Sequence, residues 1–233
     1  MGRVTTADLW HHYGRVRAER DRAVPGSFRW SWGQDVGPGA EVLGGLTGAV
    51  VADLGAGAAR HAAHLVVRHV PGRVDAVDAS PAQYAMATAL YGSLAPRLRL
   101  VRQDVVAHLR ANPGGYDVLY SVFGALDFTE PRELLPAAAS ALRPGGRLVF
   151  STLAHCLSGK PAQPDVTAVD VPAKTPDGGS ATLRRWVLQE HVWVKVLDGA
   201  GFAGIRVEEL PAGEGDRAAA ALLISAELPV GTV

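Results

Sequence analysis

The sequence has almost no cysteine and no excess of charge of either sign. Cys156 is the only cysteine among the 233 residues, so no disulfide can form within the chain and no thiolate cluster can bind a metal. The 23 basic and 23 acidic residues balance to a formal net charge of zero. Because a nucleic-acid-binding protein is expected to carry a basic face, the composition argues against a nucleic-acid partner.

Long apolar runs and several catalytic motifs are also missing. The sequence contains no run of about 18 apolar residues, which argues against a membrane-spanning helix. The first residues lack the apolar segment of a secretion signal, so we expect a cytoplasmic protein. The Gly-x-Ser-x-Gly motif, the Gly-Lys-Ser/Thr phosphate loop and His-Glu-x-x-His are absent, which excludes three common enzyme classes.

The most informative segment that is present runs from residue 50 to residue 59. An apolar run ends in Asp53, and Gly55 and Gly57 follow it. This order is typical of a strand that enters a tight turn, where bare backbone approaches a nucleotide-like ligand. A carboxylate at Asp53 would repel the pyrophosphate of a dinucleotide and attract the ammonium and sulfonium groups of S-adenosylmethionine. Arg60 replaces the last glycine of the dinucleotide pattern, which also argues against a nicotinamide cofactor.

A second acid follows at the spacing that a nucleoside-binding fold requires. Asp78 ends the short strand predicted at 74–78, roughly 20 residues after the glycine turn. A carboxylate accepts hydrogen bonds from both ribose hydroxyls, and such charge-assisted bonds are strong. We therefore expect Asp78 to bind a ribose.

With these residues the sequence resembles the class I S-adenosylmethionine-dependent methyltransferases. The segment 53–57, then Asp78, Asp104, the segment 116–121 and the segment 142–148 occur in the order and at the spacing of that family. The resemblance covers about residues 40–155 and is looser beyond them. The family's third glycine is Ala59 here, which is small enough to leave the turn plausible.

The resemblance implies an α/β fold: a doubly wound, mostly parallel seven-stranded sheet of the Rossmann-like methyltransferase type, with an antiparallel C-terminal strand pair. The alternation of apolar runs and helical patterns also predicts a parallel, doubly wound sheet. Strands are predicted at 49–54, 73–78, 98–102, 116–121, 147–152, 205–209 and 219–226, and helices at 5–22, 58–69, 81–91, 105–111, 131–143 and 187–198.

Two segments outside this alternation are predicted to cover the site. Residues 1–40 are expected to form an N-terminal helical lid, and Trp30 and Trp32 either close its mouth or pack it onto the core. Residues 41–233 are expected to form the methyltransferase core. Within it, residues 156–185 are rich in proline and glycine and lack clear periodicity, so we expect a substrate-cap loop there.

The cofactor-binding residues follow from the resemblance. Asp53 and the backbone of Gly55 are assigned to the methionine end of the cofactor. Asp104 is assigned to the adenine amino group and the backbone of Val105 to an adenine nitrogen; the alternative for Asp104 is a helix N-cap. The full predicted set is Tyr13, Asp53, Gly55, Ala56, Gly57, Asp78, Ala79, Asp104, Val105 and Ser121.

Substrate-facing residues are predicted near the ends of the later strands. Phe123 follows the fourth strand, and Trp186 and His191 lie at the start of the last helix; for all three the alternative is packing or capping. His155 follows the fifth strand and is the candidate general base, because the ordinary pKa of histidine is near neutrality. Its alternative is a plain loop residue.

The other histidines are not assigned to the site. His61 and His64 share a helix face, which could hold a metal, but no third ligand is apparent and a solvated face is expected. His69 and His108 are expected at the surface. No metal site is predicted.

The sequence therefore favours an enzyme that transfers a methyl group from S-adenosylmethionine to an oxygen, nitrogen or carbon atom of a small molecule. Residues 121–124 lack the Asn/Asp-Pro-Pro-aromatic motif of enzymes that methylate base amines. Secondary metabolism is an interpretation of composition and pocket size, and either a monomer or a homodimer is compatible. A protein that binds the cofactor without transferring methyl groups, and a nicotinamide-dependent oxidoreductase, remain as alternatives.

Overall fold

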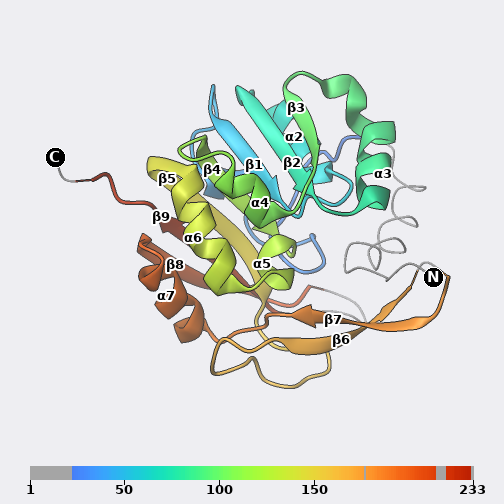
Figure 1. The fold of residues 1–233 in the computed structure, drawn as a ribbon, viewed down its shortest axis with the longest axis vertical. Coiled ribbons are helices and arrows are strands. Elements are labelled where there is room, and N and C mark those ends of the chain that lie inside the picture. The colour runs from blue at the N-terminus through green and yellow to red at the C-terminus, as the bar shows by residue number, and fades with distance from the viewer. Residues whose placement is uncertain (1–22, 176, 214–218, 232–233) are drawn as a thin grey trace.

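The centre of the protein is a seven-stranded sheet, seen in a computed structural model that describes residues 23–175, 177–213 and 219–231. The strand order is β3-β2-β1-β4-β5-β9-β8 (Figure 1). β1 to β5 are parallel, whereas β9 is antiparallel to both of its neighbours. The strands are β1 (Val50–Leu54), β2 (Arg73–Asp78), β3 (Leu98–Arg102), β4 (Tyr116–Val122), β5 (Leu142–Leu153), β8 (Ala203–Leu210) and β9 (Ala221–Glu227).

This topology confirms the predicted fold class and the antiparallel C-terminal pair. β5 begins five residues earlier than the predicted 147, because Leu142 pairs with Tyr116 ahead of an irregularity in the ladder. The predicted helix 5–22, with Tyr13, lies outside the described residues. From β1 the next strands along the chain, β2 and β3, extend the sheet in one direction, and β4 and β5 extend it in the other. Ligands of such sheets bind at this switch point, beyond the carboxyl ends of the strands.

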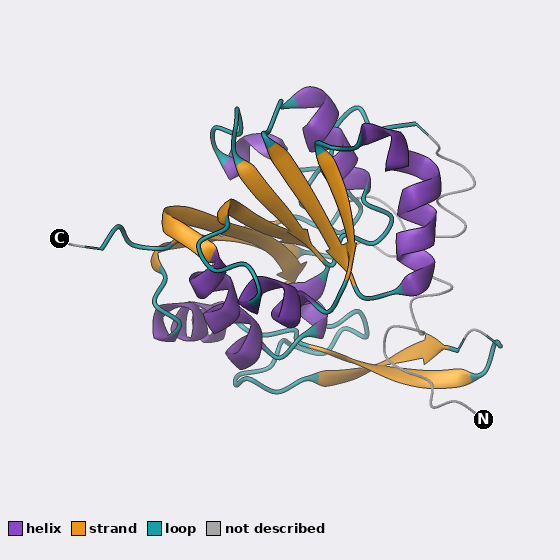
Figure 2. Cartoon of the chain, turned by 45° about the horizontal axis from the view of Figure 1, so that its top comes forward, coloured by secondary structure: helices purple, strands orange, loops and turns teal. Residues whose placement is uncertain are grey.

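Helices cover both faces of the sheet (Figure 2). One large core cluster joins the sheet to α4, α6 and α7, and a second large cluster joins it to α2, α3 and the segment 28–46. Among the described residues, no helix is long and apolar enough to cross a membrane. The helices are α2 (Arg60–Arg68), α3 (Pro81–Tyr91), α4 (Val105–Arg110), α5 (Ala125–Phe128), α6 (Pro131–Ala141) and α7 (Glu190–Gly199), with short 3-10 turns η2 (Ala40–Leu43) and η3 (Gly92–Leu94).

The predicted surface positions of two histidines are wrong. His64 is 4% exposed, and its Nδ1 lies 2.8 Å from the Pro25 carbonyl oxygen. His108 is 3% exposed, and its Nε2 lies 2.6 Å from the Tyr116 hydroxyl, which donates to the buried carboxylate of Asp75. The chain before β1 covers α2, and a buried polar network covers the inner side of α4. Helical periodicity within a single segment cannot predict either of these two contacts.

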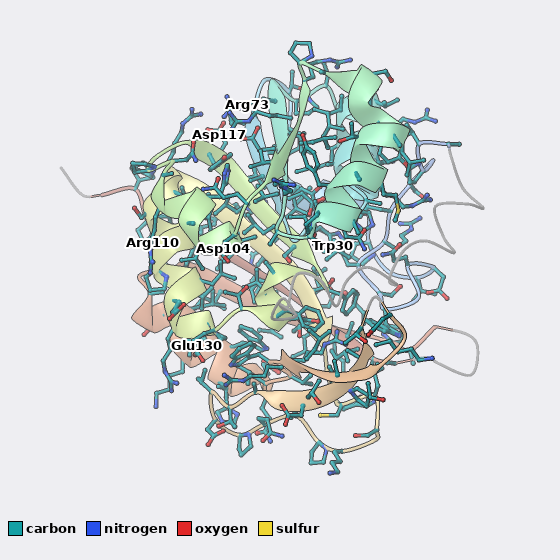
Figure 3. The ribbon with its side chains drawn as sticks, turned by 45° about the vertical axis from the view of Figure 1, so that its right-hand side comes forward. Trp30, Arg73, Asp104, Arg110, Asp117 and Glu130 are labelled. Atoms are coloured by element: carbon teal, nitrogen blue, oxygen red, sulfur yellow. The ribbon has the colours of Figure 1, made fainter. Side chains whose placement is uncertain are left out.

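The tryptophans of the N-terminal segment have different surroundings. Trp30 is fully buried and donates from Nε1 to the Gly39 carbonyl at 2.8 Å, so it packs this segment onto the core (Figure 3). Trp32 is half-buried, and its ring meets that of Phe123 edge to face, with centroids 5.0 Å apart. Trp32 therefore lies beside the turn that follows β4.

The segment 156–185, expected to be irregular, contains a two-stranded antiparallel hairpin of β6 (Val169–Lys174) and β7 (Ser180–Arg185). It forms a sheet of its own that extends below the main sheet in Figure 1. Pro172 lies inside β6, opposite Thr182. A proline is tolerated there because a two-stranded ribbon consists only of edge strands.

A buried ion pair fastens this hairpin to the domain. Arg185 donates from Nε to Oδ2 of Asp127 at 3.0 Å, and its Nη2 contacts the same oxygen. Its guanidinium lies 5.0 Å from the Trp32 ring centroid and 5.3 Å from that of Phe128. The pair thus connects the hairpin to α5 and to the N-terminal segment.

The turns after β1 and β4 are in backbone contact. Gly55 has a φ of +78°, and a Cβ placed on it would lie 2.4 Å from the Ala125 nitrogen. A Cβ on Gly124 would lie 2.6 Å from the Leu54 carbonyl oxygen. Glycine is required at both positions because no side chain fits between the two turns.

We predict that Gly55→Ala destabilises the protein much more than Gly48→Ala, measured by urea unfolding. Gly48 has a similar φ of +75°, but a Cβ placed on it would meet no atom within 4 Å, so its variant reports the backbone cost alone, about 1 kcal/mol. Gly55→Ala adds the overlap with Ala125. Equal losses of stability in the two variants would contradict the close approach.

We predict that Arg185→Leu lowers the free energy of unfolding by about 3 kcal/mol, because it leaves the buried Asp127 carboxylate without its cation. The matched control is Arg184→Leu on the same strand, where the side chain is exposed and only overlies the Trp186 ring. That control should cost roughly 0.5–1 kcal/mol. Similar losses in both variants would show that the ion pair does not hold the hairpin.

Candidate functional site

The candidate site lies where β1, β2 and β4 end. Both of its acids come from strand ends: Asp53 is the fourth residue of β1, and Asp78 is the last of β2. The glycine turn between β1 and α2 lies beside them. The predicted cofactor residues of these three strands are therefore brought together at one edge of the sheet.

Asp78 is half-buried and holds the glycine turn in place. Its Oδ2 accepts from the Gly57 N–H at 2.8 Å, and its Oδ1 accepts from the Ser80 N–H at 2.8 Å. Burial raises the pKa of Asp78, and these two backbone donors oppose the rise. Each oxygen retains a second lone pair, so the carboxylate can still accept from two hydroxyls. Ala79, the next residue, is exposed.

The turn itself is held against β2. The N–H groups of Gly55 and Ala56 both donate to the Val77 carbonyl, at 2.9 and 3.0 Å. Since this donor of Gly55 is already used, the carbonyl is the part of its backbone that a ligand would contact. Ala59 is fully buried with a φ of +58°, a left-handed conformation that costs alanine more than glycine.

Asp53 is almost fully buried and points toward α2. It is 3% exposed, and its Oδ2 accepts from the Tyr120 hydroxyl at 2.8 Å. The pKa of Asp53 is raised to about 7, because burial and the charge of Asp78 together outweigh the Tyr120 hydrogen bond and the Ala62 backbone N–H, which lower it. At neutral pH the side chain therefore occurs in both charged and uncharged forms.

Asp104 is the N-cap of α4, as its alternative interpretation held (Figure 3). Its Oδ1 accepts from the Ala107 N–H at 2.9 Å, and the side chain is exposed. Capping uses one oxygen and leaves Oδ2 as a further acceptor. Val105 begins the helix and is buried. An adenine contact by either residue stays a prediction.

The end of β4 combines a fully buried residue with a half-buried one. Ser121 is fully buried, and its hydroxyl donates to the Leu54 carbonyl at 2.7 Å, which holds β4 against β1. Phe123 is half-buried with a φ of +48°. A residue other than glycine in this conformation is uncommon, and such residues cluster at functional sites.

The remaining predicted residues are more widely spread. His155 is half-buried, two residues beyond β5, and forms an isolated bridge with Pro161. Trp186 is 4% exposed and packs in the core with α6 and α7, as its packing alternative held. His191 is exposed in the first turn of α7. Substrate contacts by these residues stay predictions, and Tyr13 lies outside the described residues.

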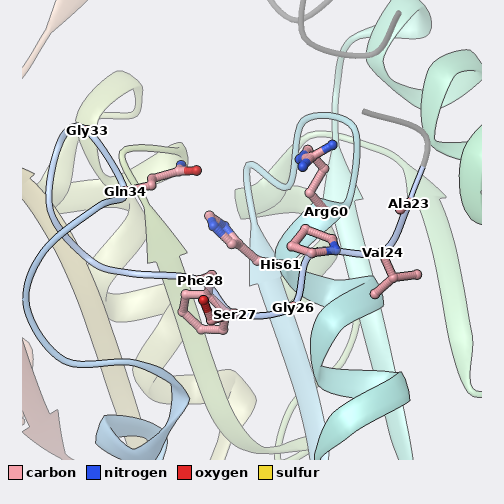
Figure 4. Close-up of a pocket in the computed structure, with 10 residues that line it drawn as sticks. Ala23, Val24, Gly26, Ser27, Phe28, Gly33, Gln34, Arg60 and His61 are labelled. Carbon is pink, nitrogen blue, oxygen red and sulfur yellow. The ribbon is translucent and has the colours of Figure 1, made fainter. Parts of the chain in front are cut away.

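A pocket of about 510 Å³ lies between the N-terminal segment and the start of α2. Figure 4 shows Arg60 and His61 of α2 and Gln34 of the loop opposite among its lining residues. The His61 ring lies 4.5 Å from that of Phe28, centroid to centroid. In the part of the chain that the structure describes, no three His, Cys, Asp or Glu side chains are grouped to hold a metal ion.

Sequence reasoning missed Tyr120 and the group formed by Trp32, Asp127 and Arg185. Tyr120 lies opposite Asp53 in the ladder between β1 and β4. Its position in the apolar run 116–122 gives it the same burial signal as its neighbours. A tyrosine inside a predicted parallel strand is itself a signal, because its buried hydroxyl needs a hydrogen-bond partner on a neighbouring strand or helix.

Comparison with known proteins agrees with this geometry. Residues 51–146 match a family described as a methyltransferase domain. A ubiquinone biosynthesis O-methyltransferase of Pectobacterium carotovorum is 34% identical over 77 residues, which is 33% of this chain and 31% of that protein. The chain thus matches less than a third of that relative's length.

Solved structures share the fold. An S-adenosylmethionine-dependent methyltransferase from Mesorhizobium loti aligns with a TM-score of 0.60 and 23% identity, covering 80% of this chain and 94% of that one. A phosphoethanolamine N-methyltransferase 2 of Haemonchus contortus, in complex with phosphomonomethylethanolamine and S-adenosylhomocysteine, aligns with a TM-score of 0.69 and 13% identity. The alignment covers 97% of this chain and 61% of the Haemonchus contortus protein.

The sheet order, the glycine turn between two acids and the family match lead to one conclusion. Residues 51–146 match a methyltransferase domain, and the whole sheet has the strand order of the Rossmann-like methyltransferase fold.

Proposed function

We propose that this protein transfers the methyl group of S-adenosylmethionine to an oxygen, nitrogen or carbon atom of a small molecule. The observation that carries the proposal is the pair of carboxyl groups, Asp53 and Asp78, on either side of the glycine turn at the strand-order switch. Such a pair suits a ligand with cationic groups and a ribose, and it disfavours a pyrophosphate.

In this proposal the residues at the sheet edge bind three parts of the cofactor. Asp78 accepts from the ribose hydroxyls while the Gly57 and Ser80 N–H groups orient it. Oδ2 of Asp104 accepts from the adenine amino group. The methionine end lies near Asp53 and the Gly55 carbonyl, and the pocket bearing Arg60 gives its carboxylate a cationic neighbour.

The bound cofactor supplies a methyl carbon that is already activated by sulfonium. The protein therefore mainly aligns the acceptor and excludes water, and alignment alone contributes roughly 7–11 kcal/mol in favourable cases. Phe123, Trp32 and the loop with His155 lie past the ends of β4 and β5, where the acceptor is expected. His155 is proposed to remove a proton from acceptors that must lose one, which adds roughly 10²- to 10⁴-fold.

Several features support a small acceptor. Aromatic side chains border the proposed acceptor end, and Arg185 of the hairpin lies over the Trp32 ring beside it. Two similar proteins also point to small molecules: one is named as a ubiquinone biosynthesis O-methyltransferase, and the other is solved in complex with phosphomonomethylethanolamine. We extend the proposal to lids formed by residues 1–40 and 156–185, and to a cytoplasmic enzyme of secondary metabolism.

The direct test measures transfer of labelled methyl groups to a panel of phenols, amines, carboxylic acids and activated carbon acids. We expect product with at least one class and no label in proteins or RNA added to parallel reactions. A protein that binds the cofactor but methylates no member of the panel would support the binding-only alternative.

Asp78→Ala should weaken S-adenosylhomocysteine binding by about 1.5–3 kcal/mol, because a charge-assisted hydrogen bond to ribose is lost. Isothermal titration calorimetry gives the affinity, and urea unfolding checks that the variant is folded. Asp165→Ala, an exposed carboxylate of the segment before the hairpin, is the control and should bind like the wild type. Unchanged affinity in Asp78→Ala would remove this residue from the ribose site.

His155→Ala should lower turnover by roughly 10²-fold with a hydroxyl or amine acceptor, because the base is lost. Its affinity for S-adenosylhomocysteine should stay at the wild-type value, since His155 lies outside the cofactor residues. Turnover at the wild-type rate would leave His155 a plain loop residue, as its alternative interpretation holds.

A further inference from the structure

We propose that Asp53 and Tyr120 form a charge-sensing pair, through which the protein's preference for S-adenosylmethionine over S-adenosylhomocysteine depends on the protonation of Asp53. The inference rests on the proposed function and deepens it by assigning Tyr120 as a positioning residue. It also names a proton as a participant in cofactor exchange.

The geometry isolates one carboxyl group beside the proposed cofactor. Asp53 is 3% exposed, one residue before the end of β1 and two before Gly55. Its Oδ2 is held by the Tyr120 hydroxyl at 2.8 Å. Tyr120 is itself fully buried; its ring packs against Phe28 and Trp30 at centroid distances of 6.3 Å each. The pair therefore cannot exchange its hydrogen bond for water without moving the N-terminal segment.

The charges around Asp53 leave its ionisation open to a ligand. On β4 it faces Tyr120, whose pKa burial raises, so this hydroxyl remains a donor. On β2 it faces the carboxylate of Asp78, which disfavours a second negative charge. From α2 the Ala62 backbone N–H favours the charged form. Arg60, His61 and His64 are the titratable side chains at the start of that helix, and burial lowers the pKa of His64.

The two forms of the cofactor differ by one positive charge. Both carry an ammonium and a carboxylate group, so the sulfonium is the main difference in charge between them. In methyl transfer the acceptor lone pair forms the new bond to the methyl carbon, and the carbon–sulfur electron pair stays on sulfur. The sulfonium thereby becomes a neutral thioether, and the charge that favours ionised Asp53 disappears.

Proton uptake follows from this loss of charge. With S-adenosylmethionine bound, the positive charge lowers the pKa of Asp53 and favours the carboxylate. Once the thioether has formed, that effect ends, and Asp53 takes a proton from solvent near neutral pH. The protonated site no longer distinguishes the charged cofactor from its product, so high pH favours retention of the charged form.

The test measures the dissociation constants of both cofactor forms by calorimetry from about pH 5.5 to about pH 8.5. In the wild type the preference for S-adenosylmethionine should increase on the order of tenfold across this range, as expected for one unscreened charge pair in a buried site. In Asp53→Asn the ratio should be constant. In Tyr120→Phe the increase should move to higher pH, because a hydrogen bond that favours the carboxylate is lost.

The outcomes separate this inference from the proposed function. A wild-type ratio that does not change with pH, or an Asp53→Asn protein that retains the wild-type profile, would overturn the charge-sensing pair while leaving cofactor binding intact. A protein that binds neither form at any pH would instead overturn the proposed function. The Tyr120→Phe measurement stays informative if Asp53→Asn fails to fold, because the Asp53 carboxyl group is still present there.

Discussion

The backbone contact between the turns after β1 and β4 is the constraint on which the rest of the site depends. Gly55 and Gly124 leave no room for a Cβ atom between the turns, so the ends of the two strands meet directly. On the other side, β2 pairs with β1, and this pairing brings Asp53 and Asp78 to the same edge. The Val77 carbonyl then accepts from the Gly55 and Ala56 N–H groups, and Asp78 accepts from Gly57. The turn is thus fixed before any ligand binds.

Charge decides which ligand this arrangement suits. Removing Asp53 from water disfavours its ionised form, and no described basic side chain is bonded to it to offset that cost. A cation placed beside the turn would supply the compensation, whereas a pyrophosphate would increase the repulsion from Asp53 and Asp78. The nicotinamide alternative therefore conflicts with the electrostatics as well as with Arg60. The same reasoning underlies the proposed dependence of cofactor preference on the protonation of Asp53.

Much of this could be predicted from the sequence, because the relevant signals are local. The apolar run of β1 leads directly into Asp53, Gly55 and Gly57, which lie within five residues of one another. The missing parts depend on contacts between distant segments. Tyr120 meets Asp53 only through strand pairing, His64 is buried only because the chain near Pro25 covers it, and the hairpin forms only when residues 169–174 find residues 180–185. Asp104 shows a different limit, since an N-cap and an adenine acceptor require the same residue at the same place.

The most direct test of the central claim is calorimetric titration of the wild-type protein at neutral pH with S-adenosylmethionine and, separately, with NAD. The account predicts saturable binding of S-adenosylmethionine at a single site per chain and no binding of NAD. Binding of NAD, or no binding of S-adenosylmethionine by the folded protein, would contradict the assignment of the two acids and the glycine turn to a cationic methyl donor.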